Sequence, residues 1–226
     1  MRKRSLGALA AGALVIGLLV GGVSAGPVTD ATVFLAHGIP GQKVDVYIAG
    51  DEVLSNWRYG KVATLENVAP GVYKVKVRTP AQSGKGTLLV GASLEIEAGD
   101  NVTVVAYVKS GDPFLQAFDN DVVFTDIGDA ILQVRHTAKA PKVDVWANGT
   151  EITPGDGIAK GEEFALEVPP GVYAYWAAAH NDFVPVIGPD VSELEAAHAY
   201  QVMAVGTNAS NYRFIVIDQD FTPPPA

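Results

Sequence analysis

An internal repeat constrains the fold of this chain more than any other feature of its sequence. Residues 33–37 read Val-Phe-Leu-Ala-His, and a short loop joins them to Lys-Val-Asp-Val-Tyr at 43–47. Ninety-nine positions later the chain reads Leu-Gln-Val-Arg-His at 132–136 and Lys-Val-Asp-Val-Trp at 142–146. A repeat of this length is close to the size of one domain and much longer than a solenoid unit. We therefore expect two tandem copies of one module.

The hydrophobic pattern alternates with period two, which predicts strands with one buried face. Many short strands separated by turn signals are typical of a β-sandwich. The predicted fold class is all-β, with two tandem immunoglobulin-like antiparallel β-sandwich domains after an N-terminal signal peptide. The strands expected in the first copy are 31–36, 44–48, 62–67, 72–78, 87–97 and 102–108, and those in the second are 130–136, 142–147, 163–168, 172–178, 183–187, 191–195 and 200–205.

The repeat and the composition of the ends divide the chain into five segments. Arg2, Lys3 and Arg4 precede an apolar run that ends in small residues, which is the layout of a secretory signal. An uncleaved membrane anchor is the alternative for the same segment. The predicted boundaries are a signal peptide at 1–25, a first module at 26–121, a linker at 122–129, a second module at 130–220 and a Pro-rich tail at 221–226.

The charge balance narrows the classes of partner. Without the basic residues of the signal segment, 13 Lys and Arg face 25 Asp and Glu, a formal charge of −12. An acidic surface of this size repels nucleic acid and anionic lipid. The chain has no cysteine, which excludes disulfides and thiol catalysis. We expect a secreted or surface-associated protein that binds no nucleic acid and does not enter the membrane once the signal is cleaved.

Two ionisable pairs recur at equal spacing in both copies, His37 with Asp45 and His136 with Asp144. A hairpin between their strands would bring each imidazole near its carboxylate. The functional interpretation is a metal ligand pair or an oriented base, and the structural interpretation is a hydrogen bond that closes the edge of the sandwich. We favour the structural one, because neither copy supplies a third partner at a shared position.

Acidic residues gather near the boundary between the copies, where their oxygens could bind calcium. Their spacing matches no known calcium loop, and Asp is common in solvated turns. We therefore expect no cofactor and keep calcium at the junction as the alternative. The residues concerned are Asp112, Asp119, Asn120, Asp121, Asp126 and Asp129.

Three aromatic residues are the candidate ligand contacts. Trp57 and Tyr59 lie in a polar stretch, and Trp176 lies in an aromatic cluster of the second copy. Flat rings beside polar groups can stack on sugars or anchor a protein interface. For the loop with Trp57 and Tyr59 we favour packing against the end of the sandwich, because aromatic loop residues often cap a core.

The loop from His37 through Gly38-Ile39-Pro40-Gly41 into Val44–Tyr47 resembles the domain-of-unknown-function 4397 family, as does Ala-Pro-Gly-Val-Tyr at 69–73. The second copy matches through Arg135–Ala138, the strand at 143–145 and Pro-Pro-Gly-Val-Tyr at 169–173. The resemblance covers roughly residues 31 to 218. It implies secreted or wall-attached bacterial proteins, tandem copies and an immunoglobulin-like sandwich, with no established activity.

Motifs of known enzymes are largely missing. Gly91–Glu95 lacks the final glycine of a nucleophile elbow, and no histidine opens a zinc-protease motif. We predict a non-enzymatic protein with a binding or structural role, whose partner is an extracellular protein or polysaccharide. A carbohydrate-binding module that uses Trp57 or Trp176 is the first alternative. A metal-dependent hydrolase is the second, and it requires His37 and Asp45 to converge with a third ligand.

Overall fold

The computed structural model of the protein describes residues 30–81, 86–120 and 122–223. The predicted signal peptide at 1–25 and the last three residues of the predicted tail lie outside them. The described residues form strands and no helix, and so no helix among them could cross a membrane. The all-β prediction is confirmed.

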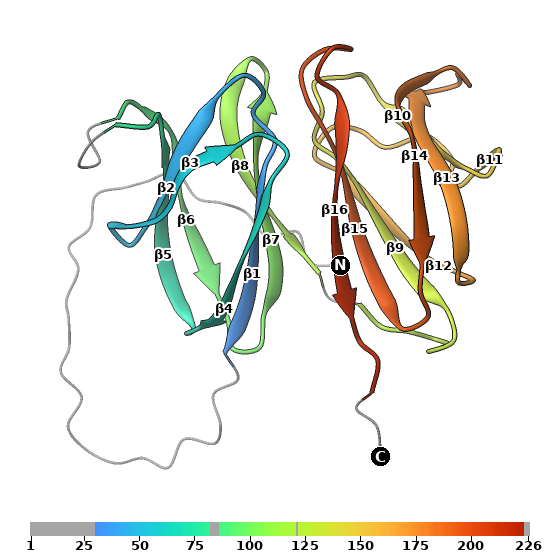
Figure 1. The fold of residues 1–226 in the computed structure, drawn as a ribbon, viewed down its shortest axis with the longest axis horizontal. Helices are drawn as coiled ribbons and strands as arrows, with labels where there is room; N and C mark the ends of the chain where they lie inside the picture. The colour runs from blue at the N-terminus through green and yellow to red at the C-terminus, as the bar shows by residue number, and fades with distance from the viewer. Residues whose placement is uncertain (1–29, 82–85, 121, 224–226) are drawn as a thin grey trace.

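The first eight strands form one sandwich, which we call the first module (Figure 1). One sheet has the order β3-β2-β5-β6 and the other β4-β1-β7-β8. The strands are β1 (Ala31–His37), β2 (Lys43–Ile48), β3 (Asp51–Arg58), β4 (Val62–Val68), β5 (Gly71–Arg78), β6 (Leu88–Ile96), β7 (Asn101–Lys109) and β8 (Asp112–Asp119).

The remaining eight strands repeat this topology and form the second module. The sheet orders are β11-β10-β13-β14 and β12-β9-β15-β16. The strands are β9 (Ala130–His136), β10 (Val143–Ala147), β11 (Thr150–Glu151), β12 (Glu163–Val168), β13 (Gly171–Ala179), β14 (Pro185–Leu194), β15 (His198–Val205) and β16 (Arg213–Asp220). In each module one pair is parallel, β1 with β7 and β9 with β15, and every other named pair is antiparallel.

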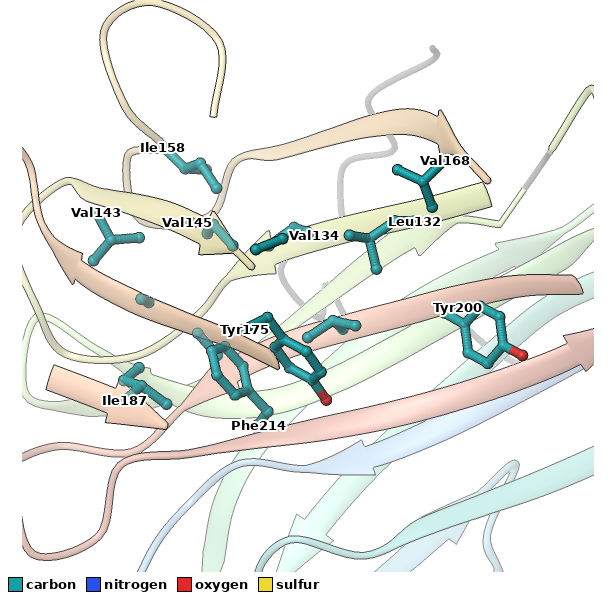
Figure 2. Close-up of a cluster of buried hydrophobic side chains, with 14 of the residues drawn as sticks. Leu132, Val134, Val143, Val145, Ile158, Val168, Tyr175, Ile187, Tyr200 and Phe214 are labelled. Carbon is teal, nitrogen blue, oxygen red and sulfur yellow. The ribbon is translucent and has the colours of Figure 1, made fainter. Parts of the chain in front are cut away.

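Each module has its own hydrophobic core between its two sheets. Every second residue of a strand points inward, as with Val44 and Val46 of β2 or Val143 and Val145 of β10. Figure 2 shows the second core, in which Tyr175 of β13 and Phe214 of β16 meet between the sheets. Burying one such side chain stabilises the fold by about 1.5–3 kcal/mol.

A third apolar cluster joins the two modules. The β4-β1-β7-β8 sheet of the first module packs face to face on the β12-β9-β15-β16 sheet of the second, so that the molecule has four sheet layers (Figure 1). The buried residues of this junction are Phe34, Ala36, Val105, Tyr107 and Phe118 from the first module and Met203, Val205, Ile215 and Ile217 from the second.

A chain of side-chain hydrogen bonds crosses the same junction. It runs through Gln133, Gln201, Gln219, Asn101, Asn120 and Thr103, with donor–acceptor distances of 2.6 to 2.9 Å. A buried amide with no partner would cost about 1–3 kcal/mol. The linked amides therefore fix how the two sheets lie on one another.

Three cations of the second module also lie on aromatic rings of the first. The guanidinium of Arg135 lies 4.9 Å from the ring centroid of Phe118, and that of Arg213 lies 4.6 Å from Tyr59. The ammonium of Lys160 lies 5.7 Å from Tyr107. A cation over a ring is attracted by the negative face of the π-system. The second module supplies the cations and the first supplies the rings, so the two surfaces of the junction are complementary and not alike.

Candidate functional site

The hairpin expected between the strands of each His and Asp does not form, and this prediction is wrong. β1 and β2 lie in different sheets, as do β9 and β10, because the chain crosses the sandwich between them. Both histidines are fully buried and bond to backbone instead. Nε2 of His37 lies 3.2 Å from the carbonyl oxygen of Gln42, and Nε2 of His136 lies 2.8 Å from that of Pro141. Each imidazole therefore holds the loop that follows its own strand.

Burial sets the protonation state of these two histidines. It lowers the pKa of His37 to about 4, against the raising effect of the hydrogen bond to Gln42. Burial likewise lowers the pKa of His136, against its backbone hydrogen bonds to Pro141 and Ala140. Both imidazoles are neutral at pH 7 and enclosed by protein, which suits a structural role.

The carboxylate of each aspartate binds backbone N–H groups outside its own strand. The carboxylate of Asp45 accepts from the backbone N–H of Asn56 at 2.8 Å and of Ala81 at 3.3 Å. That of Asp144 accepts from the N–H of Asn181 at 2.7 Å and lies 2.9 Å from Nδ1 of His180. The His–Asp pair of the second module therefore uses His180 in place of His136.

The acidic residues proposed for calcium are spread out. Asp112 and Asp119 occupy opposite ends of β8, and Asp121 lies outside the described residues. Asn120 is engaged by Thr103 and Asn101, and Asp126 accepts from the N–H of Gly128. Within the described ranges, no three His, Asp or Glu side chains are grouped closely enough to hold a metal ion.

Trp57 and Tyr59 pack against the protein itself. Trp57 belongs to β3, packs against the first core, and has its ring 5.4 Å from that of His37. The hydroxyl of Tyr59 donates to the carbonyl oxygen of Asn211 in the second module, and Arg213 covers its ring. Tyr59 therefore belongs to the junction between the modules.

Trp176 has different surroundings, on the outer face of the β11-β10-β13-β14 sheet. It lies opposite Trp146 on the neighbouring strand, and the two indoles are stacked with centroids 6.1 Å apart. The ring of Phe183, from the loop between β13 and β14, meets both indoles edge-on at 5.0 and 5.5 Å. The three rings form a small cluster on the outside of the second module.

Exposed aliphatic residues extend this cluster. Val172 is 62% exposed, Val191 67% and Phe183 57%, values that are high for large apolar side chains. Such residues gathered on one face mark an interaction site more often than residues scattered singly. We call this set the aromatic face, which comprises Trp146, Val172, Trp176, Phe183, Val184, Val186 and Val191.

The corresponding face of the first module is mostly charged, and it shares with the second module one exposed valine, Val72, the counterpart of Val172. Lys74, Lys76 and Arg78 point outward from β5, because Val75 and Val77 between them fill the core. The residues one hundred positions later are Ala174, Trp176 and Ala178. Where the register pairs Tyr47 with Lys76 in the first module, it pairs Trp146 with Trp176 in the second. The two copies share a scaffold and differ in the chemistry of this one face.

The sequence pointed to Trp176, but not to its neighbours Trp146, Phe183 and His180. Trp146 stands in the repeated Val-Asp-Val-aromatic motif, which disguised it as part of the scaffold. A comparison of the copies position by position gives the missing signal, because Lys76 and Pro80 of the first correspond to Trp176 and His180 of the second.

Comparison with known protein families agrees with the resemblance noted in the sequence. The family model described as a domain of unknown function, DUF4397, matches residues 31–146, just over half of the chain. The chain belongs to this family. The match to the DUF4397 family covers the whole first module and the first two strands of the second.

Other comparisons add little. No curated protein matches the chain. Among solved structures, it is similar to the Bacillus anthracis TIE protein, at 12% identity and a TM-score of 0.25 over 84% of this chain and 34% of that one, so that it spans about a third of that protein. It is also similar to a proposed cell adhesion protein from Bacteroides eggerthii DSM 20697, at 11% identity and a TM-score of 0.21 over 86% and 97% of the two chains. At such TM-scores neither likeness carries an argument.

Proposed function

We propose that this protein is a non-enzymatic binding protein that works outside the cytoplasm and holds a protein partner on its aromatic face. One observation carries the proposal. The second copy presents two partly exposed indoles, an exposed phenyl ring and valines where the first copy presents mostly cations. Exposed apolar side chains gain free energy when a partner removes them from water, about 25 cal/mol per Å². The signal-like segment at 1–25 supports a place outside the cytoplasm.

The chemistry of the face favours a protein partner over a polysaccharide. Sugar rings stack on open aromatic faces beside polar groups. Here the indoles face each other, Phe183 stands against both, and the Nε1 atoms of Trp146 and Trp176 are buried. The most exposed members of the face are Phe183 and valines. The junction between the modules gives a precedent, since there one sheet face already covers another.

The placement of the titratable groups supports a role without catalysis. His37 and His136 are buried and bonded to backbone, and Asp45 and Asp144 hold loops. A general base must lie within hydrogen-bond reach of its substrate. The imidazole of His180 is partly exposed, and its Nδ1 lies 2.9 Å from the carboxylate of Asp144.

A matched pair of valine substitutions tests this proposal. Val191→Lys puts a charge in the aromatic face, and Val123→Lys puts the same charge on the linker, where the valine is also exposed. Extracellular proteins of the organism that makes this chain are captured on the immobilised chain. Each captured protein is then purified and titrated against the unmodified chain and against both variants. A true partner should bind the Val191→Lys variant at least about tenfold more weakly and the Val123→Lys variant unchanged.

Two results would contradict the proposal. One is a purified partner whose affinity is the same for both variants. The other is a glycan that changes the tryptophan fluorescence of the unmodified chain but not of a Trp176→Lys variant, which would favour the carbohydrate-binding alternative. Thermal melts of all variants show whether each remains folded.

A further inference from the structure

Two lysines meet where the two modules meet, away from the aromatic face, and the positive charge of a third, Lys139, acts on one of them. Lys109 ends β7 of the first module, whereas Lys139 and Lys160 belong to loops of the second. The ammonium of Lys160 crosses the junction and donates to the carbonyl oxygen of Val108 at 2.6 Å. That bond places the charge of Lys160 beside the backbone of Lys109. Side chains from both modules therefore build one cluster.

Carboxylates do not balance this cluster. In the part of the chain that the structure describes, none of the three ammonium groups is paired with an Asp or Glu, although the chain as a whole carries a net charge of −9. Burial lowers the pKa of Lys160, and the positive charges of Lys139 and Lys109 lower it further. Three positive charges therefore act on one another here, and the neighbouring carboxylate is that of Asp112, which lies opposite Lys109 in the register of β7 with β8.

The ammonium groups also have restricted positions. Lys160 lies over the ring of Tyr107, and the ammonium of Lys109 lies 4.6 Å from the ring centroid of Phe114. A half-buried cation is screened less by water than an exposed one, so that an anion beside it gains more. Lysine binds phosphate as a compact point charge with three donors.

We propose that Lys109, Lys139 and Lys160 form an anion site that takes a phosphate group at the junction of the modules. A dianion among the three ammonium groups relieves their mutual repulsion and keeps the hydrogen bond of Lys160 to Val108. Both modules contribute to the site, so it exists only while the junction is closed. The phosphate could be free in solution or repeated along a surface, and the two sources share this chemistry.

The test uses three probes on the full chain at constant ionic strength. Inorganic phosphate represents the free anion, tripolyphosphate a short polyanion, and phosphatidylglycerol vesicles a phosphate-bearing surface. Lys109→Gln and Lys139→Gln remove exposed charges without touching the Lys160 bond. Lys76→Gln removes the same charge from the outer face of the first module and is the control. Calorimetric titration gives affinities, and the lysine Cε–Hε signals locate the site.

We expect saturable binding of at least one probe. Lys109→Gln and Lys139→Gln should each weaken it about fivefold, and Lys76→Gln less than twofold. Saturation by inorganic phosphate identifies a site for the free anion, and binding to vesicles alone identifies a surface. The proposal is overturned if no probe saturates, or if Lys76→Gln weakens binding as much as the other two variants do.

Discussion

His37 and His136 are fully enclosed imidazoles, whereas His198 sits near the surface among acids. Burial disfavours the charged form of all three. For His198 the carboxylates of Asp218, Asp220 and Glu195 outweigh this cost and raise its pKa. Its Nδ1 lies 2.8 Å from Asp218. Lowering the pH should therefore destabilise the fold through the buried histidines and stabilise it through His198.

The buried histidines, His37 and His136, should make the fold sensitive to acid. The pKa of His37 is about 4 in the folded chain and about 6.5 when unfolded, so the unfolded state takes up the proton first. The resulting stability is complete above about pH 6.5 and declines by up to about 3 kcal/mol as the pH falls to 4. Urea denaturation between pH 7.5 and 4.5 gives the free energy of unfolding at each pH. This free energy should fall less steeply with decreasing pH for His37→Gln than for the unmodified chain.

His198→Gln is the control with the opposite sign. The folded pKa of His198 is raised, so its contribution is fully present below about pH 6.5 and is lost as the pH rises through the folded value. This variant should be less stable than the unmodified chain at pH 5.5 and equal to it at alkaline pH. Parallel curves for the two histidine variants would contradict the assignment.

At the scale of strands and loops, Asp45 and Asp144 hold equivalent positions and tie different loops to their sheets. Asp45 accepts from the backbone N–H groups of Asn56 and Ala81. Asp144 accepts from the backbone N–H of Asn181 and contacts the ring Nδ1 of His180. Gly157 lies against the second pair, where an added Cβ would come within 2.7 Å of the carboxylate. In the second module the loop so held carries Phe183 of the aromatic face.

Removing the first of these carboxylates should destabilise the first module. Asp45→Ala leaves two backbone N–H groups without their acceptor, at a cost of about 2–4 kcal/mol in the free energy of unfolding. Asp45→Asn keeps one side-chain oxygen and should lose about half as much. Urea denaturation measures both. Equal losses in the two variants would show that packing, and not hydrogen bonding, is responsible.

The strands predicted correctly lie in all four sheets, including β1, β7, β9 and β15 of the two sheets that meet at the junction. β2 and β5 alternate clearly, because their sheet faces solvent on one side. β3, β8 and β16 were missed; each lies at the edge of its sheet, and its polar and apolar residues do not alternate. The predicted strands at 183–187 and 191–195 are one strand, β14, whose register shifts twice against β13. Period-two reasoning therefore failed for these edge strands, and it succeeded for the central strands of all four sheets.

At the scale of the whole molecule, the buried junction should make the two modules unfold together. Ile215 and Val216 are neighbours on β16, but Ile215 is buried in the junction and Val216 is partly exposed. Ile215→Asp buries an unpaired charge there, which typically lowers the free energy of unfolding by about 3 kcal/mol or more. Val216→Asp adds the same charge outside it.

Calorimetry should show one transition for the unmodified chain and for Val216→Asp. It should show two for Ile215→Asp, whose modules then melt separately and whose residues 122–129 become a site of rapid proteolysis. A single transition for Ile215→Asp at the temperature found for Val216→Asp would mean that the junction adds no stability.

The way cations meet rings at the junction limits how this architecture can grow. The rings of Tyr59, Tyr107 and Phe118 are covered by Arg213, Lys160 and Arg135. The sheet face with the cations is thus covered by the sheet face with the rings. Neither face remains exposed to bind another module of the same kind. Stacking by this contact is self-terminating at two. A chain that repeated the unit four times would form two separate pairs, with the aromatic face of each pair still open to solvent.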